Sequence, residues 1–147
     1  MGLIKAQQID LKKVYLSGGI YPSDKIATEQ WRMIAAESLN SKGFITIDPC
    51  RNKLVYEYGV YTPKEITARD HADINAADLI LLNGNPLGNH LSIGTWCEME
   101  RAHNQGKPIV VFSQDPRVVH HPWVLDYAAR IFPTAEEAVA YIETFWT

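Results

Sequence analysis

Cysteine is scarce in this sequence, and no long run of apolar residues occurs. Only Cys50 and Cys97 are present among the 147 residues, too few for a disulfide framework and without the spacing of a zinc site. No window approaches the roughly 18 apolar residues of a membrane span, and residues 1–13 lack the apolar core of a signal peptide. We therefore expect two free thiols, no metal site and a cytoplasmic protein.

A strong bias in charge is also missing. Lys and Arg number 14, Asp and Glu 17, and the net charge is -3. Because affinity for duplex nucleic acid rests on neutralising many phosphates, we expect neither a duplex nor a membrane partner. The charge balance does not exclude small phosphorylated ligands, because binding them needs only a local positive site. Hydrophobic and charged fractions of 46% and 21% exclude the disordered, collagen-like and coiled-coil classes.

Short β-branched runs alternate with helical segments, the pattern of an α/β fold with a parallel sheet. We predict one domain over residues 1–147 with a flavodoxin-like, doubly wound, five-stranded parallel sheet, residues 1–12 being a loosely ordered extension. The expected strands are 13–17, 44–47, 78–83, 108–112 and 130–132. The expected helices are 24–42 after a Ser23 cap, one opening at the 62–65 capping box, 92–105, 122–129, and one from 134 to the C-terminus, with loops at 50–61 and 113–121.

Doubly wound sheets bind ligands beyond the carboxyl ends of their strands. Here that rule selects residues 17–21, 48–51, 83–92 and 113–121. The Gly18-Gly19 turn would let a ligand approach the backbone closely. It is neither a dinucleotide fingerprint nor a Walker A loop, because the third glycine and the Gly-Lys-Ser/Thr are missing. A tight exit from the strand explains it equally well.

The segment from Ser92 to Glu98 follows the most apolar strand and opens a helix. Ser92 and the first free backbone N–H groups would form an anion site. Glu98 lies more than a turn further in, and Gly94, on the same face, leaves that face open. A carboxylate over bare backbone suits a nucleophile. Alternatively, Glu98 is exposed and pairs with Arg101 three residues on.

Cleavage of a glycoside needs a second carboxylate, which donates or relays a proton. Asp70 and Asp73 lie on the helix that precedes the apolar strand. On pattern alone both belong to a solvated helix face, although Asp70 could reach a common mouth with Glu98. His120 and His121 lack a third ligand at metal spacing, which again predicts no metal.

Taken in order, these segments resemble the nucleoside 2-deoxyribosyltransferase family, including the related nucleoside 5'-monophosphate N-glycosidases. The resemblance extends from Lys13 to Ile142. It rests on Val14-Tyr15-Leu16-Ser17-Gly18-Gly19-Ile20, Arg69-Asp70 with Ala77-Asp78, Ser92-Ile93-Gly94-Thr95 with Glu98, Gly106-Lys107-Pro108-Ile109, and His121-Pro122.

The resemblance implies an enzyme of nucleotide salvage that uses no cofactor. The family's glutamate attacks the anomeric carbon and holds a glycosyl ester, and Glu98 matches it. Asp70 matches the aspartate that assists base departure, and Tyr15 would orient the nucleophile. These three are the expected catalytic residues. The expected substrate contacts are Ser17, Gly18, Gly19, Ile20, Arg51, Asn83, Ser92, Gly94 and His121.

One position departs from the transferase pattern. Transferases acting on unphosphorylated deoxynucleosides usually carry an Asp six residues before the glutamate, where this sequence has Ser92. In the 5'-monophosphate N-glycosidases, a serine there contacts the phosphate, which a carboxylate would repel. We expect 2'-deoxyribosyl transfer between bases. The first alternative is hydrolysis of a (deoxy)nucleoside 5'-monophosphate, and the second is a nucleotide-binding sensor without catalysis.

The expected partners follow from the same resemblance. They are a nucleoside or its 5'-monophosphate, a free nucleobase as acceptor, and further copies of the chain. The family commonly places its active sites at subunit interfaces. Residues His121, Trp123 and Asp126 lie where a neighbour's contribution would come from.

Overall fold

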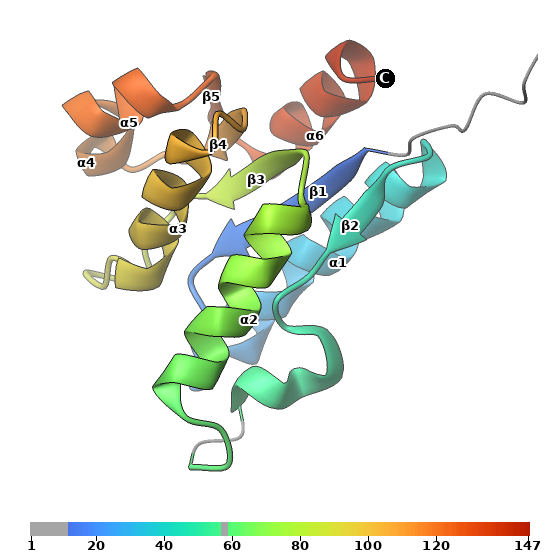
Figure 1. Cartoon of the computed structure of the whole chain (residues 1–147). Coiled ribbons are helices and arrows are strands. Elements are labelled where there is room, and N and C mark those ends of the chain that lie inside the picture. Colours follow the sequence, from blue (N-terminus) through green and yellow to red (C-terminus); the bar gives the residue numbers. More distant parts are fainter. Residues whose placement is uncertain (1–11, 57–58) are drawn as a thin grey trace, which may run out of the picture.

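Runs of Val, Leu and Ile build the centre of a parallel sheet in the computed structural model, which describes residues 12–56 and 59–147. Figure 1 shows the sheet and its flanking helices. The strands are β1 (Lys13–Gly18), β2 (Ile45–Ile47), β3 (Leu79–Asn83), β4 (Ile109–Phe112) and β5 (Arg130–Phe132). Their order is β2-β1-β3-β4-β5, with every neighbouring pair parallel. This order confirms the predicted flavodoxin-like fold. The expected extension lies, up to residue 11, outside the described residues.

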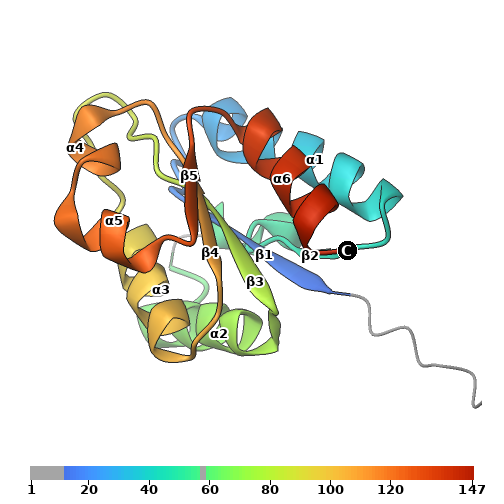
Figure 2. The ribbon, with the colours of Figure 1, turned by 90° about the horizontal axis from the view of Figure 1, so that it is seen from above.

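Helices cover both faces of the sheet. They are α1 (Lys25–Ser41), α2 (Pro63–Ala76), α3 (Ile93–Asn104), α4 (Pro116–Val119), α5 (Pro122–Tyr127) and α6 (Ala135–Phe145). Figure 2 shows α1 and α6 on one face and α2 and α3 on the other. Within the described ranges, no helix combines the length and the apolar character that crossing a membrane requires.

The strand period of two assigns alternate residues of β3 to two cores. Leu79 and Leu81 pack with α1 and α6 residues such as Leu39. Ile80 and Leu82 belong to the second core, between the sheet and α2, α3 and α5. These four residues, which make up all of β3 except Asn83, have relative exposures of 1% or less. Burial on both faces explains why this strand is an unbroken apolar run.

Most helix starts agree with the cap residues in the sequence. The capping box at α2 is confirmed: Thr62 Oγ1 accepts from the Glu65 amide at 3.1 Å, and the Glu65 side chain accepts from the Thr62 amide. The Ser23 cap is wrong, because Asp24 caps α1 by accepting from the Ala27 amide at 3.0 Å. A carboxylate accepts this bond at least as well as a hydroxyl does.

Two expected loops contain short helices. Residues 113–121 hold the one-turn helix α4, which Asp115 caps with Pro116 in the first turn. Residues 50–61 hold 3-10 turns within Arg51–Tyr56, interrupted by a kink at Asn52 and Lys53, which both have positive φ. Residues 57 and 58 of that loop lie outside the described part. Elements this short carry too few residues for a period in the sequence.

The register brings three loops to one edge of the sheet. Gly18 at the end of β1 pairs with Asn83 at the end of β3, and Asn83 pairs with Phe112 at the end of β4. The loops that follow these strands therefore begin side by side. This edge is where ligands bind in doubly wound sheets.

Candidate active site

Glu98 on α3 is held between two hydroxyl groups from β1. The Tyr15 hydroxyl donates to Glu98 Oε2, and the Ser17 hydroxyl donates to Oε1 at 2.9 Å. Residues two apart on a strand share a face, so both hydroxyls point toward α3. With one donor on each oxygen, the carboxylate has a single preferred orientation.

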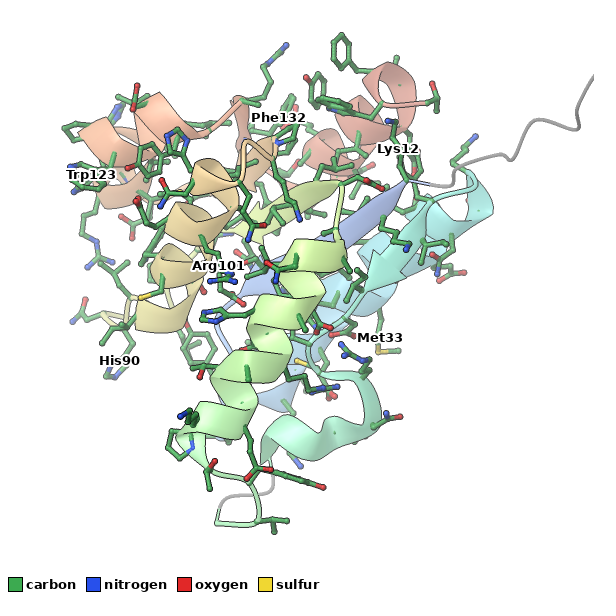
Figure 3. The ribbon with its side chains drawn as sticks, in the orientation of Figure 1. Lys12, Met33, His90, Arg101, Trp123 and Phe132 are labelled. Atoms are coloured by element: carbon green, nitrogen blue, oxygen red, sulfur yellow. The ribbon has the colours of Figure 1, made fainter. Side chains whose placement is uncertain are left out.

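The alternative of an exposed Glu98 paired with Arg101 is not what the structure shows. Arg101 lies between α2 and α3 in Figure 3 and donates to Asn75 Oδ1 at 3.3 Å. Glu98 instead faces the fully buried Tyr15 and Ser17.

Burial and a nearby negative charge make both site carboxyls weaker acids than usual. The pKa of Glu98 rises to about 7, mainly through burial and also through the charge of Asp70, while the Tyr15 and Ser17 hydrogen bonds oppose the rise. The pKa of Asp70 rises to about 6, through burial and the charge of Asp73. Burial and the Glu98 charge raise the pKa of Tyr15 far above its ordinary value, so Tyr15 stays a protonated donor. Two carboxyls that titrate near neutral pH can accept and donate protons in one reaction.

Replacing Ser17 by Ala should raise the pKa of Glu98, because the Ser17 hydroxyl stabilises the ionised carboxylate. An NMR titration of the Glu98 side-chain carbonyl measures the change. The matched control is Ser113→Ala at the end of β4, since that buried hydroxyl donates to Gly84 O instead. A Glu98 pKa that stays the same in Ser17→Ala, or that rises equally in the control, would contradict this assignment.

Asp73 is not part of a solvated helix face, as the sequence pattern indicated, because only 8% of it is exposed. It accepts two hydrogen bonds from Arg51, at 2.6 Å from Nη1 and 2.8 Å from Nη2. Arg69 donates to the backbone carbonyls of Pro49 and Arg51. Together these bonds attach the loop after β2 to α2. The charge of Arg51, an expected substrate contact, is thus already paired within the protein.

Two aromatic rings pack closely against the Gly18-Gly19 turn. A Cβ on Gly18 would lie 2.9 Å from the Trp31 ring, and one on Gly19 would lie 2.4 Å from the Tyr21 ring. The tight-exit interpretation therefore has direct support. Gly94 differs, since a Cβ there would meet nothing within 4 Å. Its face at the start of α3 is open, as expected from the sequence.

Ser92 caps α3, and His121 caps α5. Ser92 Oγ accepts from the Thr95 hydroxyl at 2.8 Å and from the Thr95 amide at 3.4 Å. His121 Nδ1 accepts from the Trp123 amide at 3.2 Å. His121 also lines an apolar groove of about 770 Å³ between α3 and the α4–α5 segment, with Trp96 and Val124. Tyr15, Asp70 and Glu98 do not line this groove, so His121 is separate from the carboxyl pair within this chain.

The structure thus brings Tyr15 and Ser17 into contact with Glu98, and the charge of Asp70 acts on the same carboxyl. Ser92 and Gly94 lie at the start of the same helix as Glu98. One residue beside this site was not predicted from the sequence: Arg32 is fully buried on α1 and donates to the carbonyls of Gly18 and Gly19. A lone arginine inside a helix gives no signal of burial. In the described part of the chain, no group of three His, Cys, Asp or Glu side chains could hold a metal ion.

Neither protein-family models nor curated proteins match the sequence. Solved structures do match its fold. A 2-desoxiribosyltransferase from Leishmania mexicana aligns with a TM-score of 0.72 and 18% identity, over 92% of this chain and 99% of that one. A 2-deoxyribosyltransferase from Bacillus psychrosaccharolyticus aligns with a TM-score of 0.67 and 18% identity, over 90% and 91%.

A CMP N-glycosidase from Clostridium botulinum has a TM-score of 0.61 and 17% identity, over 91% of this chain and all of that one (100%). At these identities, the alignments establish the architecture and its extent. Nearly the whole chain therefore has the fold that these transferase and N-glycosidase structures share.

Proposed function

We propose that this chain cleaves the N-glycosidic bond of a nucleoside, with Glu98 as the nucleophile, and passes the 2'-deoxyribosyl group to another base. The observation that carries the proposal is the Glu98 carboxylate, fixed by Tyr15 and Ser17 and electrostatically coupled to Asp70. The fold shared with 2-deoxyribosyltransferases and a CMP N-glycosidase supports it.

In the first half-reaction, a Glu98 oxygen forms a bond to the anomeric carbon as the bond from that carbon to the base nitrogen breaks. Asp70 donates a proton to the departing base, directly or through water. The transition state resembles an oxocarbenium ion, whose positive charge the carboxylate stabilises. In the second half-reaction, an acceptor nitrogen attacks the same carbon, Asp70 takes up its proton, and Glu98 leaves as a carboxylate.

A second candidate is hydrolysis of a nucleoside 5'-monophosphate, with water as the acceptor. The observation that favours it is Ser92, which places a hydroxyl rather than a carboxylate at the start of α3. Ser92 Oγ accepts from Thr95, so its own hydrogen is left to donate to a ligand. Helix N-termini stabilise bound phosphate. Arg51 is the cation that we expected to contact the phosphate, but its charge is already paired with Asp73. This pairing favours an unphosphorylated substrate, so transfer remains our first choice.

Base release from a panel of nucleosides and their 5'-monophosphates, with and without a second free base, tests the two candidates. New nucleoside formed only with acceptor base present supports transfer. Free base and sugar phosphate from monophosphates alone support hydrolysis. Tight binding without any turnover would contradict both and leave the sensor function.

A Ser92→Asp variant should separate the substrates. A carboxylate beside the phosphate would repel it, so base release from the 5'-monophosphate should fall about tenfold or more, a cost of roughly 1.4 kcal/mol. Release from the unphosphorylated nucleoside should change little. Asp also caps helices well, so thermal unfolding should match the wild type. Equal losses on both substrates would show that Ser92 does not face the phosphate.

We also propose that the protein forms a homo-oligomer through the groove between α3 and α5. Several large apolar side chains that line it are exposed, Ile93 at 82%, Trp123 at 60% and Leu91 at 44%. Figure 3 shows Trp123 at the outer edge of the molecule. Exposed apolar side chains that line one groove are typical of protein interfaces.

A further inference from the structure

Arg32 on α1 is a buried cation directly beneath the turn that follows β1. None of its surface is exposed. Its guanidinium donates to the carbonyls of Leu16 at 3.2 Å, Gly18 at 2.8 Å and Gly19 at 3.4 Å. It also donates to Thr28 O, one turn earlier on α1, at 2.6 Å. One planar group therefore links α1 to three carbonyls at the end of β1 and the start of the turn that follows it.

These bonds fix the residue that holds the nucleophile. Ser17 lies between Leu16 and Gly18, whose carbonyls both accept from Arg32. The Ser17 hydroxyl in turn donates to Glu98 Oε1. The guanidinium presents its donors in a rigid fork, whereas a lysine ammonium is a point charge on a flexible stem. Only arginine can therefore bind all of these carbonyls in this geometry.

The charge of Arg32 is only weakly neutralised. Its ion-pair partner is Asp48, whose Oδ1 lies 3.9 Å from Nε and whose side chain is 33% exposed. The other partners are neutral: the backbone carbonyls and the Trp31 ring, whose centroid lies 4.8 Å from the guanidinium carbon. Buried positive charge favours the ionised form of nearby carboxyls, and Arg32 lowers the pKa of both Glu98 and Asp70.

Other charged groups face the same two carboxyls from every element around them. Glu98 on α3 faces Tyr15 on β1 and Asp70 on α2, besides Arg32 on α1. Asp70 also interacts with Asp73 and Arg69 on α2 and with Arg51 from the loop after β2. Arg32 acts on both carboxyls, whereas Arg51 and Arg69 act on Asp70.

We propose that Arg32 is a positioning residue for the reaction: it fixes Ser17 against Glu98 and supplies the buried positive charge that lets two carboxyls share one site. The kinetic consequence rests on the proposed function. The electrostatic consequence does not, because the titration of Glu98 can be followed without substrate.

Two variants separate the charge of Arg32 from its shape. Arg32→Met removes the charge, so an NMR titration should show the pKa of Glu98 raised by about half a unit or more. Arg32→Lys keeps the charge but not the fork. It should raise the Glu98 pKa less than Arg32→Met does, since only the Ser17 hydrogen bond is loosened, and it should lower kcat for base release about tenfold, with KM changed much less. The matched control is Lys107→Met, because Lys107 also donates to backbone carbonyls but at the end of α2, away from Glu98.

The outcomes are distinct. A folded Arg32→Met with the wild-type Glu98 pKa would overturn the electrostatic role, and a wild-type kcat in Arg32→Lys would overturn the positioning role. If Arg32→Met does not fold, Asp48→Asn replaces it, because Asn can still accept from the Cys50 amide as Asp48 does. Loss of the Asp48 charge leaves Arg32 without its ion-pair partner, so the Glu98 pKa should fall. An unchanged Glu98 pKa in Asp48→Asn would again overturn the proposal. If the wild type releases no base, the proposed function is refuted. The titrations still test the electrostatic role of Arg32, because they need no substrate.

Discussion

In the Glu98→Gln variant, the rate of base release should fall at least about 100-fold, while the protein remains folded. Glutamine has nearly the same shape as glutamate and can still accept from Tyr15 or Ser17, whose hydroxyls now hold the carboxylate. Its amide cannot attack the anomeric carbon or leave as a carboxylate. Mass spectrometry of the wild type after rapid quenching should show a glycosyl adduct on Glu98, and the variant should show none.

The same variant should be more stable than the wild type above neutral pH. The pKa of Glu98 in the folded protein is about 7, above its ordinary value of 4.5. The folded state therefore binds more protons than the unfolded state between these values, so stability falls as pH rises through this window. Glutamine does not ionise and escapes this penalty. Thermal unfolding curves below and above the window would show the difference growing with pH.

Glu143→Gln is the matched control, on α6 at the opposite face of the sheet, where Glu143 accepts from Ser38 instead. It should keep the wild-type rate. If Glu98→Gln released base as fast as the wild type, covalent catalysis by Glu98 would be excluded. If the wild type bound nucleotides without turnover and Glu98→Gln bound equally well, the protein would be a sensor.

Much of this site could be predicted because it depends on regular structure. The apolar run of β3 indicates a central strand, and the parallel order then brings the ends of β1 and β3 together. A strand period of two puts Tyr15 and Ser17 on one face. The role of Ser17 was less accessible. The family resemblance implies a substrate contact for Ser17, and only the structure shows that its hydroxyl donates to Glu98.

Arg32 and Asp73 could not be predicted, because their burial depends on partners far away in the sequence. Charged residues on helices are mostly exposed, and pattern alone places both on a solvated face. Arg32 is buried because the β1 turn offers it carbonyls, and Asp73 because Arg51 reaches it from the loop after β2. That loop has no period in the sequence, so neither contact has a local signal.

The pH dependence of base release should reveal the coupling of the two carboxyls. The productive state has Glu98 ionised and Asp70 protonated, although Glu98, with a pKa of about 7, is the weaker acid than Asp70, at about 6. Near neutral pH only a minority of molecules is in this state. We expect a narrow bell-shaped profile of kcat/KM with limbs near these two values, which belong to the pair rather than to either residue.

Asp70→Asn should remove one limb of this bell and most of the rate. Asparagine cannot protonate the departing base, so kcat should fall by about 10²–10⁴-fold, the usual contribution of a general acid. Because the charge of Asp70 raises the pKa of Glu98, the remaining acid limb should move to lower pH, and the alkaline limb should disappear. A nucleoside whose base leaves without protonation should recover much of the lost rate. A variant that kept the alkaline limb, or lost equal rate on both substrates, would show that the proton comes from another group.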